Sequence, residues 1–218
     1  MITRSYGSGS PVTLVAHGLG ATPGEARIPA SGLPGTRVVV TLPSHGDAPD
    51  APPGYWDYGR IAADLTSVPA DQAVGVSLGA GALVRVLSAE PDRFHRVALL
   101  LPAVLDRPRP SFTLQQLSDL TVGPPAYVAE RRAALSRLEA AASQLPGQVA
   151  VADASVLSAV TVPVLVIGAV GDPLHPEDVA EETAAAFPAG ELWLVDSPAP
   201  MITHRTEIRH RLTSFFGG

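Results

Sequence analysis

The chain has 218 residues, 46% hydrophobic and 17% charged, which is enough for one sizeable core and predicts a single domain over residues 1–218. A formal net charge of -6 without any basic run argues against a nucleic-acid partner. All 15 cationic residues are arginine and cysteine is absent, which excludes a Schiff-base or P-loop lysine, a thiol nucleophile, disulfides and thiolate metal sites.

The first 11 residues lack the apolar core of a secretory signal. No apolar run reaches the roughly 18 residues that suggest a membrane span. We therefore expect a soluble, cytoplasmic protein with no membrane partner, acting as a monomer or a homodimer.

Short apolar runs alternate with helical patterns along the chain. The runs predict strands over residues 12–16, 37–42, 72–76, 96–101, 162–168 and 191–195. Helices are predicted over residues 58–67, 77–88, 111–119, 127–143, 177–187 and 207–216. This alternation predicts an α/β fold with a mostly parallel sheet of about six strands and helices on both faces.

Residues 106–159 differ from the rest because they carry helical patterns and no strand pattern. The stretch is too short for a second domain, so it reads as a small helical insertion. It begins beyond the carboxyl end of a predicted strand, where functional groups of such sheets gather. The insertion could therefore form a lid over a site.

The segment Gly75-Val76-Ser77-Leu78-Gly79 joins a predicted strand to a predicted helix and matches G-x-S-x-G, the nucleophile elbow. The two glycines are needed because a Cβ two residues from the serine would collide with a neighbouring element. The turn exposes the Ser77 hydroxyl and leaves the Leu78 N–H free at a helix N-terminus. Ser77 is the candidate nucleophile; the alternative is a tightly packed turn.

A serine hydroxyl needs a base, and the base needs an orienting acid. Asp172 and His204 both follow predicted strands, and the order Ser, Asp, His accompanies the elbow in this architecture. Asp172 could instead cap a helix, with Asp106 as the rival acid. His210 is the rival base, although its helical pattern favours exposure.

The other histidines have weaker claims to the site. His17 is expected to brace a loop, and His45 and His175 lie on loops that could rim a pocket. A loop histidine is more often solvated. A metal site from His45, Asp47 and His175 has no support from spacing, so no metal and no cofactor are expected.

With these parts in order, the chain resembles the α/β-hydrolase superfamily over nearly its whole length. His17-Gly18-Leu19-Gly20 resembles the family's HG motif, and residues 153–172 are similar to its run into the acid loop. The resemblance implies Leu19 and Leu78 as oxyanion-hole donors, Asp172 as the acid and His204 as the base. Thr203 stands where the family often has glycine before that histidine.

The implied reaction is hydrolysis of a small carboxylic ester or thioester through an acyl-enzyme on Ser77. Candidate pocket-lining residues, chosen from their loop positions, are Tyr55, Trp56, Leu105, Phe112 and Leu114. The alternatives are a non-catalytic ligand-binding protein and a non-hydrolytic acyltransferase or cyclase on the same fold.

Overall fold

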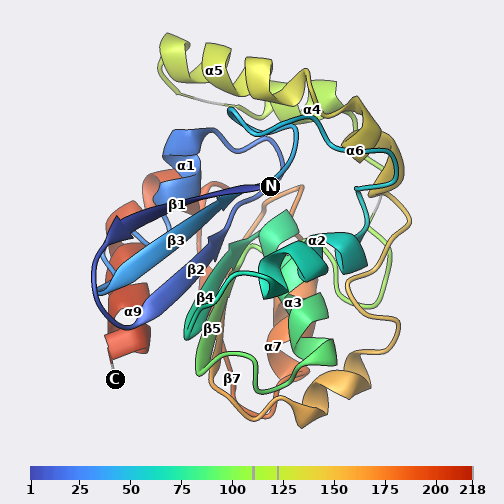
Figure 1. The fold of residues 1–218 in the computed structure, drawn as a ribbon. Helices are drawn as coiled ribbons and strands as arrows, with labels where there is room; N and C mark the ends of the chain where they lie inside the picture. Colours follow the sequence, from blue (N-terminus) through green and yellow to red (C-terminus); the bar gives the residue numbers. More distant parts are fainter. Residues whose placement is uncertain (110, 122, 218) are drawn as a thin grey trace.

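The computed structural model describes residues 1–109, 111–121 and 123–217. One seven-stranded sheet runs through the molecule in the order β1-β3-β2-β4-β5-β6-β7 (Figure 1). Its strands are β1 (Ile2–Gly7), β2 (Val12–Ala16), β3 (Thr36–Thr41), β4 (Gln72–Val76), β5 (Arg96–Leu100), β6 (Val164–Ala169) and β7 (Gly190–Val195). The pairing is parallel except between β1 and β3, which confirms the predicted mostly parallel sheet.

Helices cover both faces of the sheet, as expected. They are α1 (Pro23–Arg27), α2 (Tyr58–Thr66), α3 (Leu78–Ala89), α4 (Leu114–Asp119), α5 (Pro125–Leu135), α6 (Glu139–Gln144), the short 3-10 helix η1 (Ala154–Ala159), α7 (Glu177–Ala185), α8 (Pro200–Thr203) and α9 (Arg205–Gly217). Helices α1 and α9 share one hydrophobic cluster, and α2, α3 and α7 contribute to the other (Figure 1). The central strands are buried between these clusters, which is why they read as continuous apolar runs.

Strand β1 was not expected from the sequence. It pairs antiparallel with β3, from Ile2 opposite Thr41 to Gly7 opposite Thr36, at the edge of the sheet. Four of its six residues are exposed, so the segment carries no apolar alternation. Tertiary pairing with residues 29 to 39 positions further along the chain makes it a strand, and local sequence does not report that pairing.

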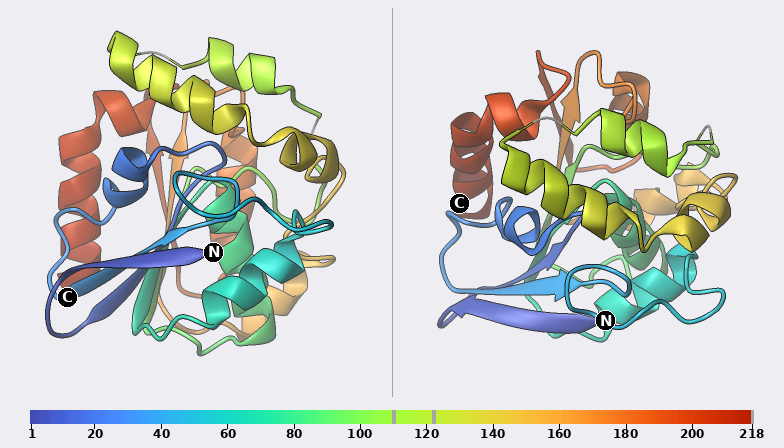
Figure 2. Two further views of the ribbon diagram at one scale, coloured as in Figure 1. Left: turned by 45° about the horizontal axis from the view of Figure 1, so that its top comes forward. Right: turned by 90° about the horizontal axis from the view of Figure 1, so that it is seen from above.

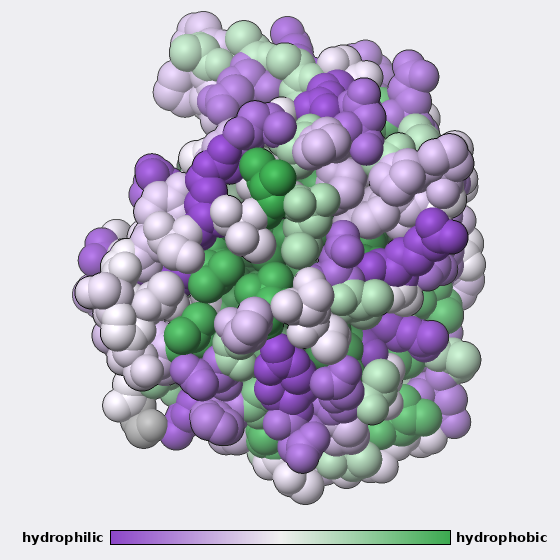
Figure 3. Space-filling view, viewed as in Figure 1, coloured by the Kyte–Doolittle hydropathy of each residue, from purple (hydrophilic) through white to green (hydrophobic). Residues whose placement is uncertain are grey.

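The segment 106–159 forms α4, α5, α6 and η1, with no strand among its described residues. The helix predicted over 127–143 is divided, because α5 ends at Leu135 and α6 begins at Glu139. Leu135 and Leu138, on either side of this break, are both buried. Seen from above, α4 to α6 lie across one end of the sheet (Figure 2), and the surface is hollowed beneath α5 (Figure 3).

Over the described residues, no helix combines the length and apolar character that crossing a membrane requires.

Candidate active site

The turn between β4 and α3 carries Ser77 in a sparsely populated backbone conformation, with φ 50° and ψ -108°. A Cβ on Gly75 would lie 2.7 Å from the Gly79 carbonyl oxygen, and one on Gly79 would lie 2.3 Å from the Ala16 oxygen. Only glycine fits at either position, because β2, β4 and the start of α3 meet there. The strained turn presents the Ser77 hydroxyl beyond the carboxyl end of β4.

A continuous chain of hydrogen bonds begins at that hydroxyl. Ser77 Oγ lies 2.9 Å from His175 Nε2, and His175 Nδ1 lies 2.7 Å from Asp172 Oδ2. The carboxylate also accepts the Leu174 N–H at 2.8 Å. This nucleophile, base and orienting acid geometry is the arrangement that activates a serine.

The loop between β6 and α7 supplies both the carboxylate and the imidazole of this series of hydrogen bonds. Burial by itself raises the pKa of the Asp172 carboxyl, but hydrogen bonds from His175 and from the Leu174 and His175 amides, with the His175 charge, hold it below its ordinary value. Asp172 therefore stays an acceptor and fixes the His175 proton on Nδ1, which leaves Nε2 free to accept the Ser77 proton.

The structure corrects the expected base, because the imidazole that contacts Ser77 is His175 and not His204. His204 lies at the junction of α8 and α9, where its Nδ1 pairs with Thr203 Oγ1 at 2.8 Å, and it does not line the pocket around Ser77. His175 follows Asp172 by three residues, so one tight loop turns its ring back toward the serine. That D-x-x-H spacing directly after a strand was the available signal.

Two buried histidines hold the loop that follows β2. His17 Nε2 accepts the Leu42 N–H at 3.1 Å, so its Nδ1–H donates to the Gly18 carbonyl at 2.8 Å. His45 Nε2 accepts the Gly20 N–H at 2.9 Å, so its Nδ1–H donates to the Pro43 carbonyl at 3.0 Å. The two rings lie 4.5 Å apart. The bracing expected of His17 is confirmed, and His45 shares it.

This bracing fixes the loop beside the nucleophile. A Cβ on Gly18 would lie 3.4 Å from Ser77 Cβ, and Leu19 lines the same pocket. Leu78 is the first residue of α3, so its N–H has no partner within the helix. The assignment of the Leu19 and Leu78 amides as oxyanion donors stays a prediction.

The buried histidine pair makes stability depend on pH. Burial lowers the pKa of His17 from 6.5 to about 4. The Gly18 carbonyl and the Glu25 charge raise this pKa and the Arg131 charge lowers it, but burial has the largest effect. Burial also lowers the pKa of His45. Between pH 6.5 and 4 the unfolded chain binds a proton at His17 that the folded chain does not. Stability is therefore lost as pH falls through this window, by roughly 3 kcal/mol for His17 alone.

Urea unfolding at pH 7.5 and 4.5 tests this expectation, with His17→Gln as the matched variant. The glutamine carbonyl can accept the Leu42 N–H without titrating. The wild type should lose roughly 2–3 kcal/mol more stability on acidification than the variant. Equal losses in the two proteins would show that His17 is not the titrating group.

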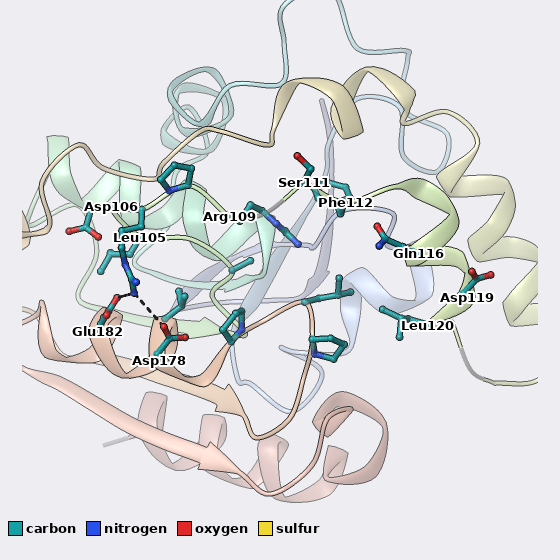
Figure 4. Close-up of a pocket in the computed structure, with 17 residues that line it drawn as sticks. Leu105, Asp106, Arg109, Ser111, Phe112, Gln116, Asp119, Leu120, Asp178 and Glu182 are labelled. Carbon is teal, nitrogen blue, oxygen red and sulfur yellow. Dashed lines mark hydrogen bonds and ion pairs between the residues drawn. The ribbon is translucent and has the colours of Figure 1, made fainter.

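A pocket of about 460 Å³ surrounds Ser77 and His175. Its apolar wall includes Leu19, Leu101, Phe112, Leu117, Leu174 and Met201. Helix α5 contributes Tyr127 and Arg131, so the helical segment covers the pocket. A second cavity of about 610 Å³ shares Arg109, Phe112 and Leu174 with it (Figure 4).

The expected pocket-lining residues divide between these cavities and the core. Phe112 lines both cavities and Leu105 lines the second. Tyr55, Trp56 and Leu114 line neither, which corrects that expectation. Tyr55 and Trp56 are buried in the main core, with the Tyr55 hydroxyl donating to Asp64 Oδ2 at 2.7 Å and the Trp56 ring edge-on to His45. Leu114 packs against the same core cluster.

A charged cluster that the sequence did not indicate ties α5 to α1. Glu25 accepts hydrogen bonds from the Tyr127 hydroxyl at 2.7 Å and from Arg131 at 3.0 Å. Arg131 also donates to the Leu19 carbonyl at 3.4 Å, so the covering helix is bonded to the loop beside Ser77. Burial and the Glu25 hydrogen bond raise the pKa of Tyr127 to about 12, so its hydroxyl stays a donor.

The rival residues lie elsewhere. Asp106 lines only the second cavity, and His210 is exposed on α9, as expected. Both ring nitrogens of His45 and both of His175 are used in the hydrogen bonds above. Over the described chain, no three His, Asp or Glu side chains are grouped to hold a metal ion.

Solved structures share this architecture over the whole chain. An esterase from Exiguobacterium antarcticum superimposes with a TM-score of 0.82 at 17% identity, over 99% of this chain and 95% of that one. A hydrolase from Oleispira antarctica gives 0.81 at 16% identity, over 99% and 94%. A meta-cleavage product hydrolase from Pseudomonas fluorescens gives 0.79 at 15% identity, over 99% and 93%.

The chain therefore has the α/β-hydrolase fold, as the sequence resemblance implied. No protein-family model and no curated protein sequence matches it. Because the structural relatives are less than 25% identical, what they share with this chain is the fold.

Proposed function

We propose that the protein is a serine hydrolase that cleaves a carboxylic ester or thioester of a small molecule through an acyl-enzyme on Ser77. The observation that carries this proposal is the unbroken chain of hydrogen bonds from Ser77 Oγ through His175 to Asp172. The pocket of about 460 Å³ at this chain is of a size that suits a small substrate.

In this mechanism Ser77 Oγ attacks the substrate carbonyl while His175 Nε2 takes the hydroxyl proton. The Leu19 and Leu78 N–H groups hold the oxyanion of the tetrahedral intermediate. His175 then gives its proton to the leaving alcohol or thiol, and the carbonyl re-forms as an acyl-enzyme. Water, deprotonated by His175, attacks the acyl-enzyme and releases the acid. Asp172 orients the imidazole and stabilises its positive charge in both halves.

Two alternatives predict different results. A ligand-binding protein without catalysis would have no activated serine, yet the hydroxyl and imidazole are in hydrogen-bond contact. An acyltransferase or cyclase would form the same acyl-enzyme but pass the acyl group to an acceptor other than water. The half of the reaction that follows acylation therefore distinguishes a hydrolase from an acyltransferase.

Labelling with a fluorophosphonate tests the proposal, with mass spectrometry to locate the adduct. We expect one adduct on Ser77, no adduct in Ser77→Ala, and labelling slowed by about 100-fold or more in His175→Ala because the base is lost. The unlabelled protein should hydrolyse p-nitrophenyl butyrate with release of free butyrate, and labelling should abolish this activity because it blocks the Ser77 hydroxyl. A folded protein that neither labels nor hydrolyses would contradict the proposal.

A further inference from the structure

Arg109 lines the same pocket as Ser77, and no described carboxylate forms an ion pair with it. It follows β5, ahead of α4, and lines both the pocket at Ser77 and the adjoining cavity. Its Nε is buried and has no hydrogen-bond partner, the one such side-chain atom over the described part of the chain. Its guanidinium carbon lies 4.5 Å from the centre of the Phe112 ring. Figure 4 shows Arg109 in the middle of the cavity, with Phe112 beside it.

The neighbouring carboxylates do not satisfy this guanidinium. Asp172 is close enough to act on its charge, but the Asp172 oxygens accept from His175 and Leu174. Asp178 and Glu182 lie at the far side of the cavity in Figure 4, where both pair with Arg107. Burial lowers the pKa of Arg109, yet an arginine remains charged in a protein, so desolvating it is costly without a counter-ion.

The charge balance of the pocket at Ser77 points the same way. Among its described lining residues the one carboxylate is Glu25, which is paired with Arg131, while Asp172 does not line it and is engaged with His175. Arg109 and Arg205 also line or border this pocket, and within the described residues neither forms an ion pair. The chain has a net charge of -6, so a pocket with excess positive charge is a local feature. Such a pocket attracts an anionic substrate.

We propose that Arg109 binds a carboxylate of the substrate, so that the ester or thioester cleaved at Ser77 carries a free acid group. This inference rests on the proposed function, whose substrate class it narrows. With Phe112 against one face of the guanidinium, recognition falls to its edges. The edge formed by the two Nη atoms, which are not among the buried unpartnered atoms, presents two parallel N–H groups that match the two oxygens of a carboxylate. Arg109 is thus a specificity-determining residue.

Matched substrates test this assignment. Mono-p-nitrophenyl adipate and p-nitrophenyl hexanoate have acyl chains of equal length and differ in the terminal carboxylate. A second pair, 4-carboxyphenyl butanoate and 4-carbamoylphenyl butanoate, places the charge on the leaving group. We expect Arg109→Gln to lower kcat/KM for the anionic member of one pair by about 10- to 100-fold, with Arg109→Lys intermediate. The neutral esters should change by less than about threefold.

Arg107→Gln is the matched control, because Arg107 is on the same loop but is exposed and paired with Asp178 and Glu182. It should leave the preference for anionic esters unchanged. Equal losses on charged and neutral esters in Arg109→Gln would mean that Arg109 acts through Asp172 and would overturn the proposal. Absence of any preference for the anionic ester in the wild type would also overturn it.

A binding measurement keeps this test separate from that of the proposed function. Adipate, the product of the first ester, should raise the melting temperature of the wild type and of Ser77→Ala but not that of Arg109→Gln. This readout needs no turnover. Failed fluorophosphonate labelling with Arg109-dependent adipate binding would reject the hydrolase and keep the anion site. Labelling at Ser77, together with the same effect of adipate on the wild type and on Arg109→Gln, would keep the hydrolase and reject the anion site.

Discussion

Replacing His175 with alanine is expected to lower kcat/KM by about 10⁴-fold or more, whereas His204→Ala should stay within about twofold of the wild type. His175 Nε2 lies 2.9 Å from Ser77 Oγ, so its loss leaves the hydroxyl without a proton acceptor. His204 pairs with Thr203 and does not line the pocket. Ester hydrolysis by the two purified variants, with circular dichroism to confirm folding, makes the comparison.

The opposite pattern of activity in these two variants would contradict the assignment of His175. If His204→Ala were inactive and His175→Ala active, the loop after β7 would have to rearrange in solution to bring His204 to Ser77. A double variant tests whether Ser77 and His175 act together. Ser77→Ala combined with His175→Ala should have a kcat/KM little lower than that of either single variant, because losses from residues that act as one unit are not additive.

Replacing Asp172 with asparagine is expected to lower kcat by about 10³- to 10⁴-fold with little effect on KM. The carboxylate accepts the His175 Nδ1–H at 2.7 Å, and an asparagine amide in its place can present a donor there. The imidazole would then carry its proton on Nε2, facing Ser77, and could not act as a base. Steady-state kinetics on p-nitrophenyl butyrate measures the effect.

Asp106→Asn provides the control for this substitution. Asp106 was the rival acid in the sequence, and it lines only the second cavity. Its loss should therefore leave kcat within about twofold of the wild type, as for a substitution outside the catalytic unit. A large loss in Asp106→Asn together with a mild effect in Asp172→Asn would overturn the assignment of the acid.

The parts of the site that could be predicted are those with a local backbone requirement. Gly75 and Gly79 flank Ser77 because Cβ atoms there would strike Gly79 and Ala16, and this requirement is visible as G-x-S-x-G. The strand runs were also visible, because strands buried on both faces must be apolar throughout. The HG loop was recognised by its resemblance to the family's motif, and His17 braces it as expected.

Whether His175 or His204 contacts Ser77 is not set by any local backbone requirement. Both follow sheet strands, and both are separated from Ser77 by about a hundred residues or more of chain. Which ring reaches the hydroxyl depends on how the loop from Asp172 to His175 turns over the carboxyl end of the sheet, and on α8 occupying the corresponding place after β7. Chain order allows either histidine and the family resemblance favoured His204, but neither of them encodes that turn.

Pocket-lining positions were missed for a related reason. Tyr55 and Trp56 lie on a loop, where exposure is the common case, yet they face inward and complete the core around His45. Arg109 was one arginine among 15, and its lack of a partner is a property of the surrounding side chains.

The alternation of strands and helices and the glycine-flanked turn at Ser77 could be predicted from sequence alone, because each depends on backbone sterics or burial within a few neighbouring residues. The edge strand β1, the imidazole that contacts Ser77 and the unpaired cation in the pocket became visible in the folded protein. Those three depend on contacts between segments far apart in the chain, whose geometry is set when the loops pack against the carboxyl ends of the strands.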